Sequence, residues 1–263
     1  MKKAVILILV STLALTLFVG VAFALIPNSA HDLSGGGFAN GGLGINACQY
    51  CHTPHQANNR DNIINGVQVD MSSVPLWNRS LPTTVYNLYN SGGNPPGAWK
   101  TLSGTTVTPP GAHSLTCLSC HDGTIGYRDV LLGGDAIGTY LANHPDPNPA
   151  NYMPPSGVGS RGYIGTDLRN THPVGVVYND IAHNANSVAG LSNVSAALNG
   201  LTNIYTVGAG AKYRIYGGTI GTGRVECGSC HDPHGDDYQH GGANAPYLRG
   251  AKADMCTDCH SRK

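Results

Sequence analysis

The feature that most constrains this chain is the arrangement of its eight cysteines. All of them fall into C-x-x-C pairs, and a histidine follows each pair directly. The motifs are CQYCH at 48–52, CLSCH at 117–121, CGSCH at 227–231 and CTDCH at 256–260. A disulfide framework places no demand on the residue after the second cysteine, and structural zinc does not need a histidine at each pair. Neither alternative explains the pattern.

A covalently attached haem explains every part of the motif. The two thiols add to the vinyl groups of the porphyrin, and the adjacent histidine supplies an axial nitrogen to the iron. We therefore expect four covalently attached haem c groups. The predicted attachment residues are Cys48, Cys51, Cys117, Cys120, Cys227, Cys230, Cys256 and Cys259. The predicted proximal iron ligands are His52, His121, His231 and His260.

Four haems also account for a composition that is poor in large side chains. The 263 residues include 36 Gly and 16 Pro but only three Phe and two Trp. This composition does not suit a coiled coil, a long-helix bundle or a helical membrane protein. Each porphyrin has a large apolar surface, which takes the place of apolar side chains in the core. The predicted fold is a multihaem cytochrome c: a mostly irregular coil wrapped around four haems, with short helices and a few short strands.

The N-terminal residues have the pattern of an export signal. Two lysines precede an apolar run that ends in Ala22-Phe23-Ala24, which predicts a signal peptide over 1–24 and a mature tetrahaem domain over 25–263. A retained anchor is the alternative, since the run is long enough to span a bilayer. We expect an exported protein, extracellular or at the cell surface and alternatively periplasmic, with no membrane span in the mature chain. Basic and acidic residues balance at 15 each, which predicts no nucleic-acid partner.

Between the second and third motifs lies a long stretch without cysteine. Residues 161–226 are predicted to form a β-rich insert, because 174–178 (VGVVY) and 211–218 (AKYRIYGG) have the composition of strands. Residues 181–200 are predicted to give one short helix. The C-x-x-C-H segments themselves are expected to form single helical turns.

Eight further histidines are available as second axial ligands. Two recur in the pattern H-x-P-H, where His55 follows His52 and His234 follows His231. A histidine three residues past a proximal ligand lies on the same side of that haem, so it reaches a neighbouring iron rather than its own. Met153 is also a candidate, since an axial methionine raises the reduction potential, but it is a weaker one because enough histidines are available without it.

Several blocks of the sequence resemble multihaem c-type cytochromes with doubled motifs, and in particular the tetrahaem subunits of extracellular cytochrome filaments (OmcE-like nanowires). The blocks are HDLS, CQYCHTPH, LTCLSCHDGTIG, GTDLRNTHPVGVVY and GRVECGSCHDPHG, followed by MCTDCH. The resemblance implies that two histidines bind each iron. It implies the distal ligands His31, His55, His172 and His234. His113 and His183 are reserves, while His144 and His240 are expected at the surface.

These features predict an electron carrier rather than an enzyme, with redox proteins or extracellular electron acceptors as partners. The resemblance implies a homopolymer, the repeating subunit of a conductive filament, in which His55 binds a haem of the adjacent subunit. A His55 that binds a haem of its own chain is the alternative. Two other functions remain open: a soluble monomeric periplasmic shuttle, and a multihaem reductase with an open site at one iron.

Overall fold

The computed structural model describes about half of the chain. The described residues are 26, 29–34, 46–58, 62–64, 67–88, 108–127, 129–131, 153, 162–178, 192, 195–197, 204–207, 212–217, 222–235 and 247–260. The predicted signal peptide and His144, His183 and His240 lie outside these ranges. Within them, no helix is both long enough and apolar enough to cross a membrane.

Every C-x-x-C-H motif lies in or next to a short helix. The helical elements in chain order are η1 (Ala47–Tyr50), α2 (Ala112–His121), η4 (Leu168–Asn170), α4 (Cys227–Cys230) and α5 (Met255–Cys259). Three of the motifs form single turns as the sequence predicts, whereas the second motif completes the ten-residue helix α2. This helix begins directly after Pro109-Pro110-Gly111, because a proline within the helix would break its hydrogen bonds.

The larger sheet is antiparallel and lies between the second and third motifs. Its strand order is β3-β7-β6-β5-β4. The strands are β3 (Val176–Val177), β4 (Ser195–Ala197), β5 (Ile204–Val207), β6 (Tyr213–Tyr216) and β7 (Arg224–Val225). A separate hairpin pairs β1 (Asn62–Ile64) with β2 (Val67–Val69). All five strands of the larger sheet fall within residues 161–226.

Two strand predictions are confirmed and one helix prediction is not. Strands β3 and β6 lie in the predicted segments 174–178 and 211–218. The helix expected within 181–200 is contradicted at 195–197, where β4 pairs Ser195 with Thr206 of β5. Serine and alanine have no strong preference for strands, so the available edge of β5 decides the conformation of this segment.

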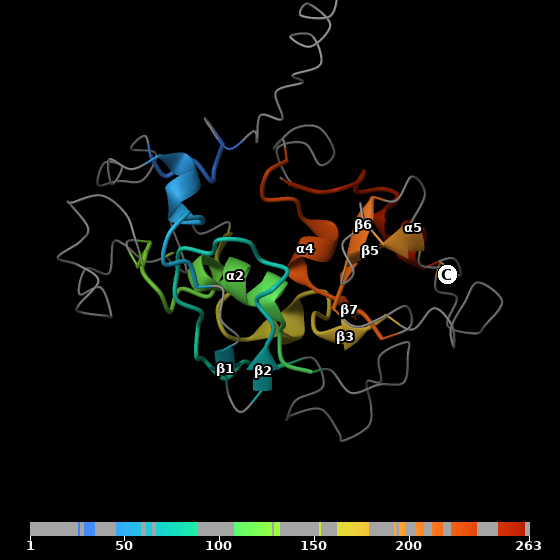
Figure 1. Cartoon of the computed structure of the whole chain (residues 1–263). Coiled ribbons are helices and arrows are strands. Elements are labelled where there is room, and N and C mark those ends of the chain that lie inside the picture. The colour runs from blue at the N-terminus through green and yellow to red at the C-terminus, as the bar shows by residue number, and fades with distance from the viewer. Residues whose placement is uncertain are drawn as a thin grey trace, which may run out of the picture.

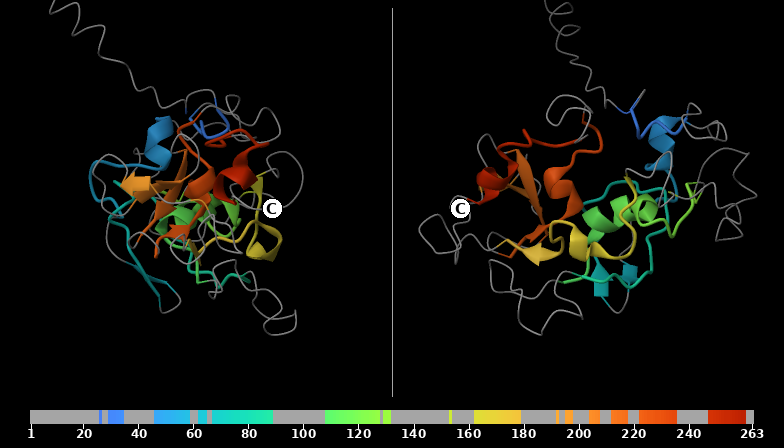
Figure 2. Two further views of the ribbon diagram at one scale, coloured as in Figure 1. Left: turned by 90° about the vertical axis from the view of Figure 1, so that its right-hand side faces the viewer. Right: turned by 180° about the vertical axis from the view of Figure 1, so that it is seen from behind.

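The described residues form two main apolar clusters, one around α2 and one against the larger sheet. A first apolar cluster surrounds α2 and includes Met71, Trp77, Leu115 and Leu118. A smaller second cluster lies against the sheet and consists of four buried residues, among them Val207 and Tyr213. Helix α4 packs against α2 and β6, and it therefore lies where the two clusters meet (Figure 1). Seen from behind, η1 lies above one end of α2, while α4, the sheet and α5 lie toward its other end (Figure 2).

Candidate functional site

The motifs share a local backbone geometry that gathers their three functional side chains. In the first motif the amide of His52 donates to the carbonyl of Cys48 at 2.9 Å. The same bond joins His231 to Cys227 at 3.1 Å and His260 to Cys256 at 2.7 Å. A bond that spans four residues closes one helical turn, so both thiols and the imidazole project from a single turn. All eight cysteines are free.

Two of the predicted proximal histidines have one ring nitrogen fixed by a backbone carbonyl. The Nδ1 atom of His52 lies 2.8 Å from the carbonyl oxygen of Pro75. The Nδ1 atom of His121 lies 2.6 Å from that of Gly162. A carbonyl only accepts, so each Nδ1 carries the proton and each Nε2 presents a lone pair, as histidine ligands in metal proteins do. Burial also lowers the pKa of His121, which favours the neutral, ligating form.

Gly162 is needed at its position behind His121. A Cβ there would lie 3.0 Å from two atoms of the His121 ring and 3.1 Å from the sulfur of Met153. The glycine therefore lets its own carbonyl approach Nδ1 closely. The sulfur of Met153 also lies close to this position, so Met153 packs near the His121 ring.

Two pairs of predicted proximal and distal histidines lie close together. The ring centroids of His31 and His121 are 6.2 Å apart with the ring of one edge-on to the other, and those of His52 and His234 are 5.9 Å apart with nearly parallel rings. Bonds between a metal and an imidazole nitrogen are about 2 Å long, so two imidazoles that bind one metal ion from opposite sides have centroids about 6 Å apart. Both separations are of this size, so each pair would supply two imidazoles to a single iron. The residues present therefore suit a haem with two histidine ligands.

His172 acts electrostatically on the fourth motif. The pKa of His260 is lowered first by burial and then by the charge that His172 carries when protonated. The Nδ1 atom of His172 lies 3.0 Å from the carbonyl oxygen of Pro173, which again leaves Nε2 for a metal.

The other described candidates have different surroundings. His55 is exposed and makes no ring contact with another described histidine. His113 is half-buried, its Nε2 lies 2.9 Å from the hydroxyl of Ser73, and its ring stacks on Tyr216 at 3.7 Å. Burial lowers the pKa of His113 to about 3. The nitrogen that would bind iron is already hydrogen-bonded, so His113 is a neutral core residue in this structure.

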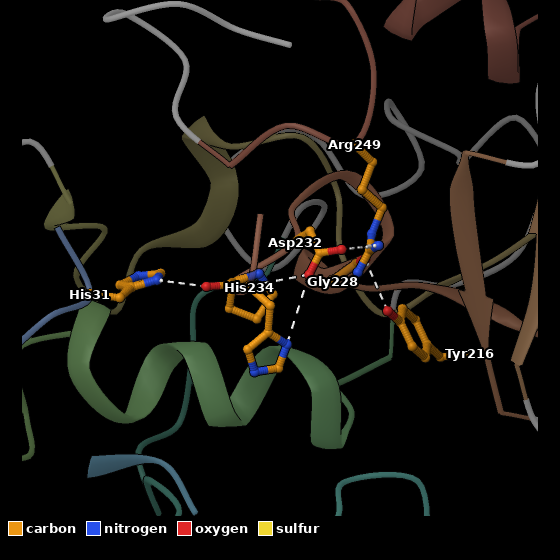
Figure 3. A network of polar contacts seen from close by, with 7 residues as sticks. His31, Tyr216, Gly228, Asp232, His234 and Arg249 are labelled. Carbon is orange, nitrogen blue, oxygen red and sulfur yellow. Dashed lines mark hydrogen bonds and ion pairs between the residues drawn. The ribbon is translucent and has the colours of Figure 1, made fainter. Parts of the chain in front are cut away.

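The segment after the third motif connects the distal candidates His31 and His234. The Nδ1 atom of His31 lies 3.4 Å from the carbonyl oxygen of Pro233, and the amide of His234 donates to Asp232 at 3.2 Å (Figure 3). Arg249 holds Asp232 in an ion pair of 2.9 Å and also donates to the carbonyl of Gly228 at 2.8 Å. One short turn thus contacts both distal candidates, which lie near the second and first motifs.

A buried cation is hydrogen-bonded to the second motif and acts electrostatically on the first. Arg79 is 1 % exposed and donates to the carbonyls of Ser119, Gly126 and Tyr127 and to the hydroxyl of Ser119. Its charge lowers the pKa of Cys51, although burial dominates and raises that pKa to about 12. Sequence reasoning missed Arg79, because nothing around it resembles a motif. Asp232 was also missed, although it lies inside the H-x-P-H pattern.

The comparisons with known proteins agree with this chemistry. The family model described as "Doubled CXXCH motif" matches residues 220–263, which contain the third and fourth motifs. No curated protein matches the chain. The matched segment has the pattern of multihaem c-type cytochromes, and its motifs imply covalently bound haem c. The class defined by sequence and site is therefore that of haem-binding electron-transfer proteins.

Proposed function

We propose that the chain is a tetrahaem c-type cytochrome that carries electrons outside the cytoplasm through closely spaced haems. The observation that carries the proposal is the approach of two histidine pairs, His31 with His121 and His52 with His234, to the separation of two imidazoles on one iron. The haem supplies one-electron chemistry at its iron. The protein fixes each motif on a helical turn and orients the imidazoles through carbonyls at Nδ1.

We assign the distal ligands from these two contacts and, for His172, from its electrostatic effect on His260. His234 serves the haem of the first motif, His31 that of the second, and His172 that of the fourth. His55 remains for the haem of the third motif. Because this assignment gives each iron two imidazoles, no iron keeps an open position for a substrate, and the proposal is an electron carrier and not an enzyme.

The same proposal extends to assembly. His55 is exposed and follows the first motif, which is the position from which a filament subunit of the resembling family reaches its neighbour. In the proposed homopolymer His55 binds the third haem of the adjacent subunit. Ligation then stabilises the subunit contact only when the facing subunit is present, so metal binding and polymerisation are coupled.

Single distal variants test the ligand assignment. We expect His31→Ala and His234→Ala each to retain four covalent haems while one iron per chain becomes high-spin in the ferric absorption and electron paramagnetic resonance spectra. His113→Phe is the matched control, since it keeps the stacking on Tyr216 and should leave all irons low-spin. A high-spin iron in the His113 variant, or none in the other two, contradicts the assignment.

His55→Ala tests assembly separately. The variant should keep four haems, gain one high-spin iron and form short filaments or none in electron micrographs. Normal filaments with low-spin iron throughout would overturn the role of His55. Unmutated monomers with four low-spin haems would instead support a soluble shuttle.

A further inference from the structure

Glu226 is the single glutamate of the 263-residue chain, and it is buried. Its carboxylate lies between two haem-binding helices. Both oxygens accept from the amide of Gly111 at 3.1 Å, and one of them also accepts from the hydroxyl of Ser114. Gly111 is the N-cap of α2, which has no capping side chain of its own. The carboxylate therefore caps α2 from the start of α4, across 115 residues of sequence.

The residues around Glu226 pack closely against its carboxylate. A Cβ at residue 111 would lie 2.7 Å from a carboxylate oxygen of Glu226, so only glycine fits opposite it. The hydroxyl of Ser114 also accepts from the amide of Cys227 at 2.9 Å. Ser114 precedes Cys117 by one helical turn, and Glu226 precedes Cys227 directly. Glu226 thus lies beside attachment residues of both the second and the third haem.

Few charges face this carboxylate. Burial is the main influence and raises the pKa of Glu226 to about 7, while Ser114, Gly111 and the positive charge of Arg224 act in the opposite direction. On α2, His113 is neutral because burial lowers its pKa to about 3. The thiols of Cys117 and Cys227 carry no charge once they are thioethers.

Tyr86 and Asp122 complete the surroundings near Cys227. The hydroxyl of Tyr86 donates to Asp122 at 2.5 Å, and burial followed by that contact raises the pKa of the phenol. Tyr86 therefore stays neutral at ordinary pH. Arg224 is the one charged group that acts directly on Glu226 among the described residues.

We propose that Glu226 is a redox-linked proton site: it binds one proton when a neighbouring haem is reduced and releases it when that haem is reoxidised. This inference rests on the proposed function. Reduction adds one electron and converts a ferric to a ferrous iron, which removes one positive charge from the same buried region. The carboxylate then loses a favourable interaction and takes up a proton from solvent. The electron comes from the redox donor of the carrier.

Redox titration of the complete holoprotein between pH 5.5 and 8.5 tests the proposal. We expect about a tenfold higher proton affinity of Glu226 in the reduced protein, so that one potential falls by about 59 mV as pH rises through the range around 7. Glu226→Gln should abolish this dependence. Asp167→Asn is the control and should retain it, because Arg169 lowers the pKa of this surface carboxyl to about 2. An unchanged slope in the Gln variant overturns the proposal.

Two further measurements separate titration from a purely structural role. Arg224→Gln removes the charge that opposes protonation and should shift the pH-dependent range upward; a cap that never titrates would show no shift. In redox-difference infrared spectra, selective ¹³C labelling of glutamate marks Glu226 alone among the carboxylic side chains of the chain. The labelled carboxyl band should appear on reduction, and its absence contradicts proton uptake.

The haem count distinguishes this proposal from the proposed function. Four covalent haems with low-spin iron but no pH dependence would refute the proton site and leave the electron carrier intact. A protein without covalent haem would refute both.

Discussion

The surroundings of the first two motifs differ from those of the last two. Around α2, eleven buried residues form one apolar cluster, and the buried cation Arg79 is hydrogen-bonded to Ser119 of the second motif and acts on Cys51 of the first. Around the sheet, four buried residues form the cluster, and α5 has no buried residue. The junction between the regions contains the buried acid Glu226.

This difference indicates how one chain can give chemically similar haems different reduction potentials. A buried positive charge favours ferrous iron, whereas a buried carboxylate favours ferric iron until it is protonated. Arg79 should therefore raise the potentials of the first two haems, and Glu226 should lower those of the second and third at high pH. Unequal potentials would give electron flow a direction within the subunit.

Removal of Arg79 should have the largest effect. Arg79→Met leaves the carbonyls of Ser119, Gly126 and Tyr127 without their buried donor, so we expect a loss of about 4 kcal/mol in the free energy of unfolding. Chemical denaturation measures this loss. The potentials of the first two haems should also fall by on the order of tens of millivolts.

Arg169→Met is the matched control for this prediction. Arg169 forms an exposed ion pair with Asp167, and its removal should leave both the stability and the potentials close to those of the unmutated protein. If the two arginine variants behaved alike, Arg79 would not distinguish the first region from the second.

The pH dependence of stability should show an intermediate effect. The pKa of Glu226 is raised from 4.5 to about 7 in the folded protein, so the folded state binds more protons than the unfolded state within this window. The free energy of unfolding should therefore fall by about 3 kcal/mol through this group as pH rises from about 4.5 to 7. Denaturation of unmutated protein and of Glu226→Gln across this range isolates the contribution, because other titrating groups are shared. Parallel curves would contradict it.

The smallest of these effects concerns the turn after the third motif. Arg249→Gln removes the ion pair with Asp232 and should destabilise the fold by about 2 kcal/mol. It should also broaden the low-spin resonances of the first two haems, because this turn orients His31 and His234. Arg249→Lys keeps the charge and should restore the resonances in part. Altered resonances of the fourth haem instead would show that the turn does not act on these ligands.

The sequence predicted the haem-binding residues of this site better than the residues that surround and position them. Repeated spacing identified the motifs, and H-x-P-H pointed to His234, because such patterns are local. The strands at 176–177 and 213–216 were also found from composition, whereas β4 was not, since its conformation depends on the edge of β5. Arg79 and Glu226 act across long sequence separations and have no local signature, although a solitary glutamate next to Cys227 was a visible clue.

The central claim is that the chain attaches four haems through thioether bonds, and the mass of the denatured mature protein tests it most directly. The account predicts the polypeptide mass plus four haem units, which acid-acetone extraction does not remove. Fewer than four haems, or bound zinc at the C-x-x-C-H motifs, would contradict it.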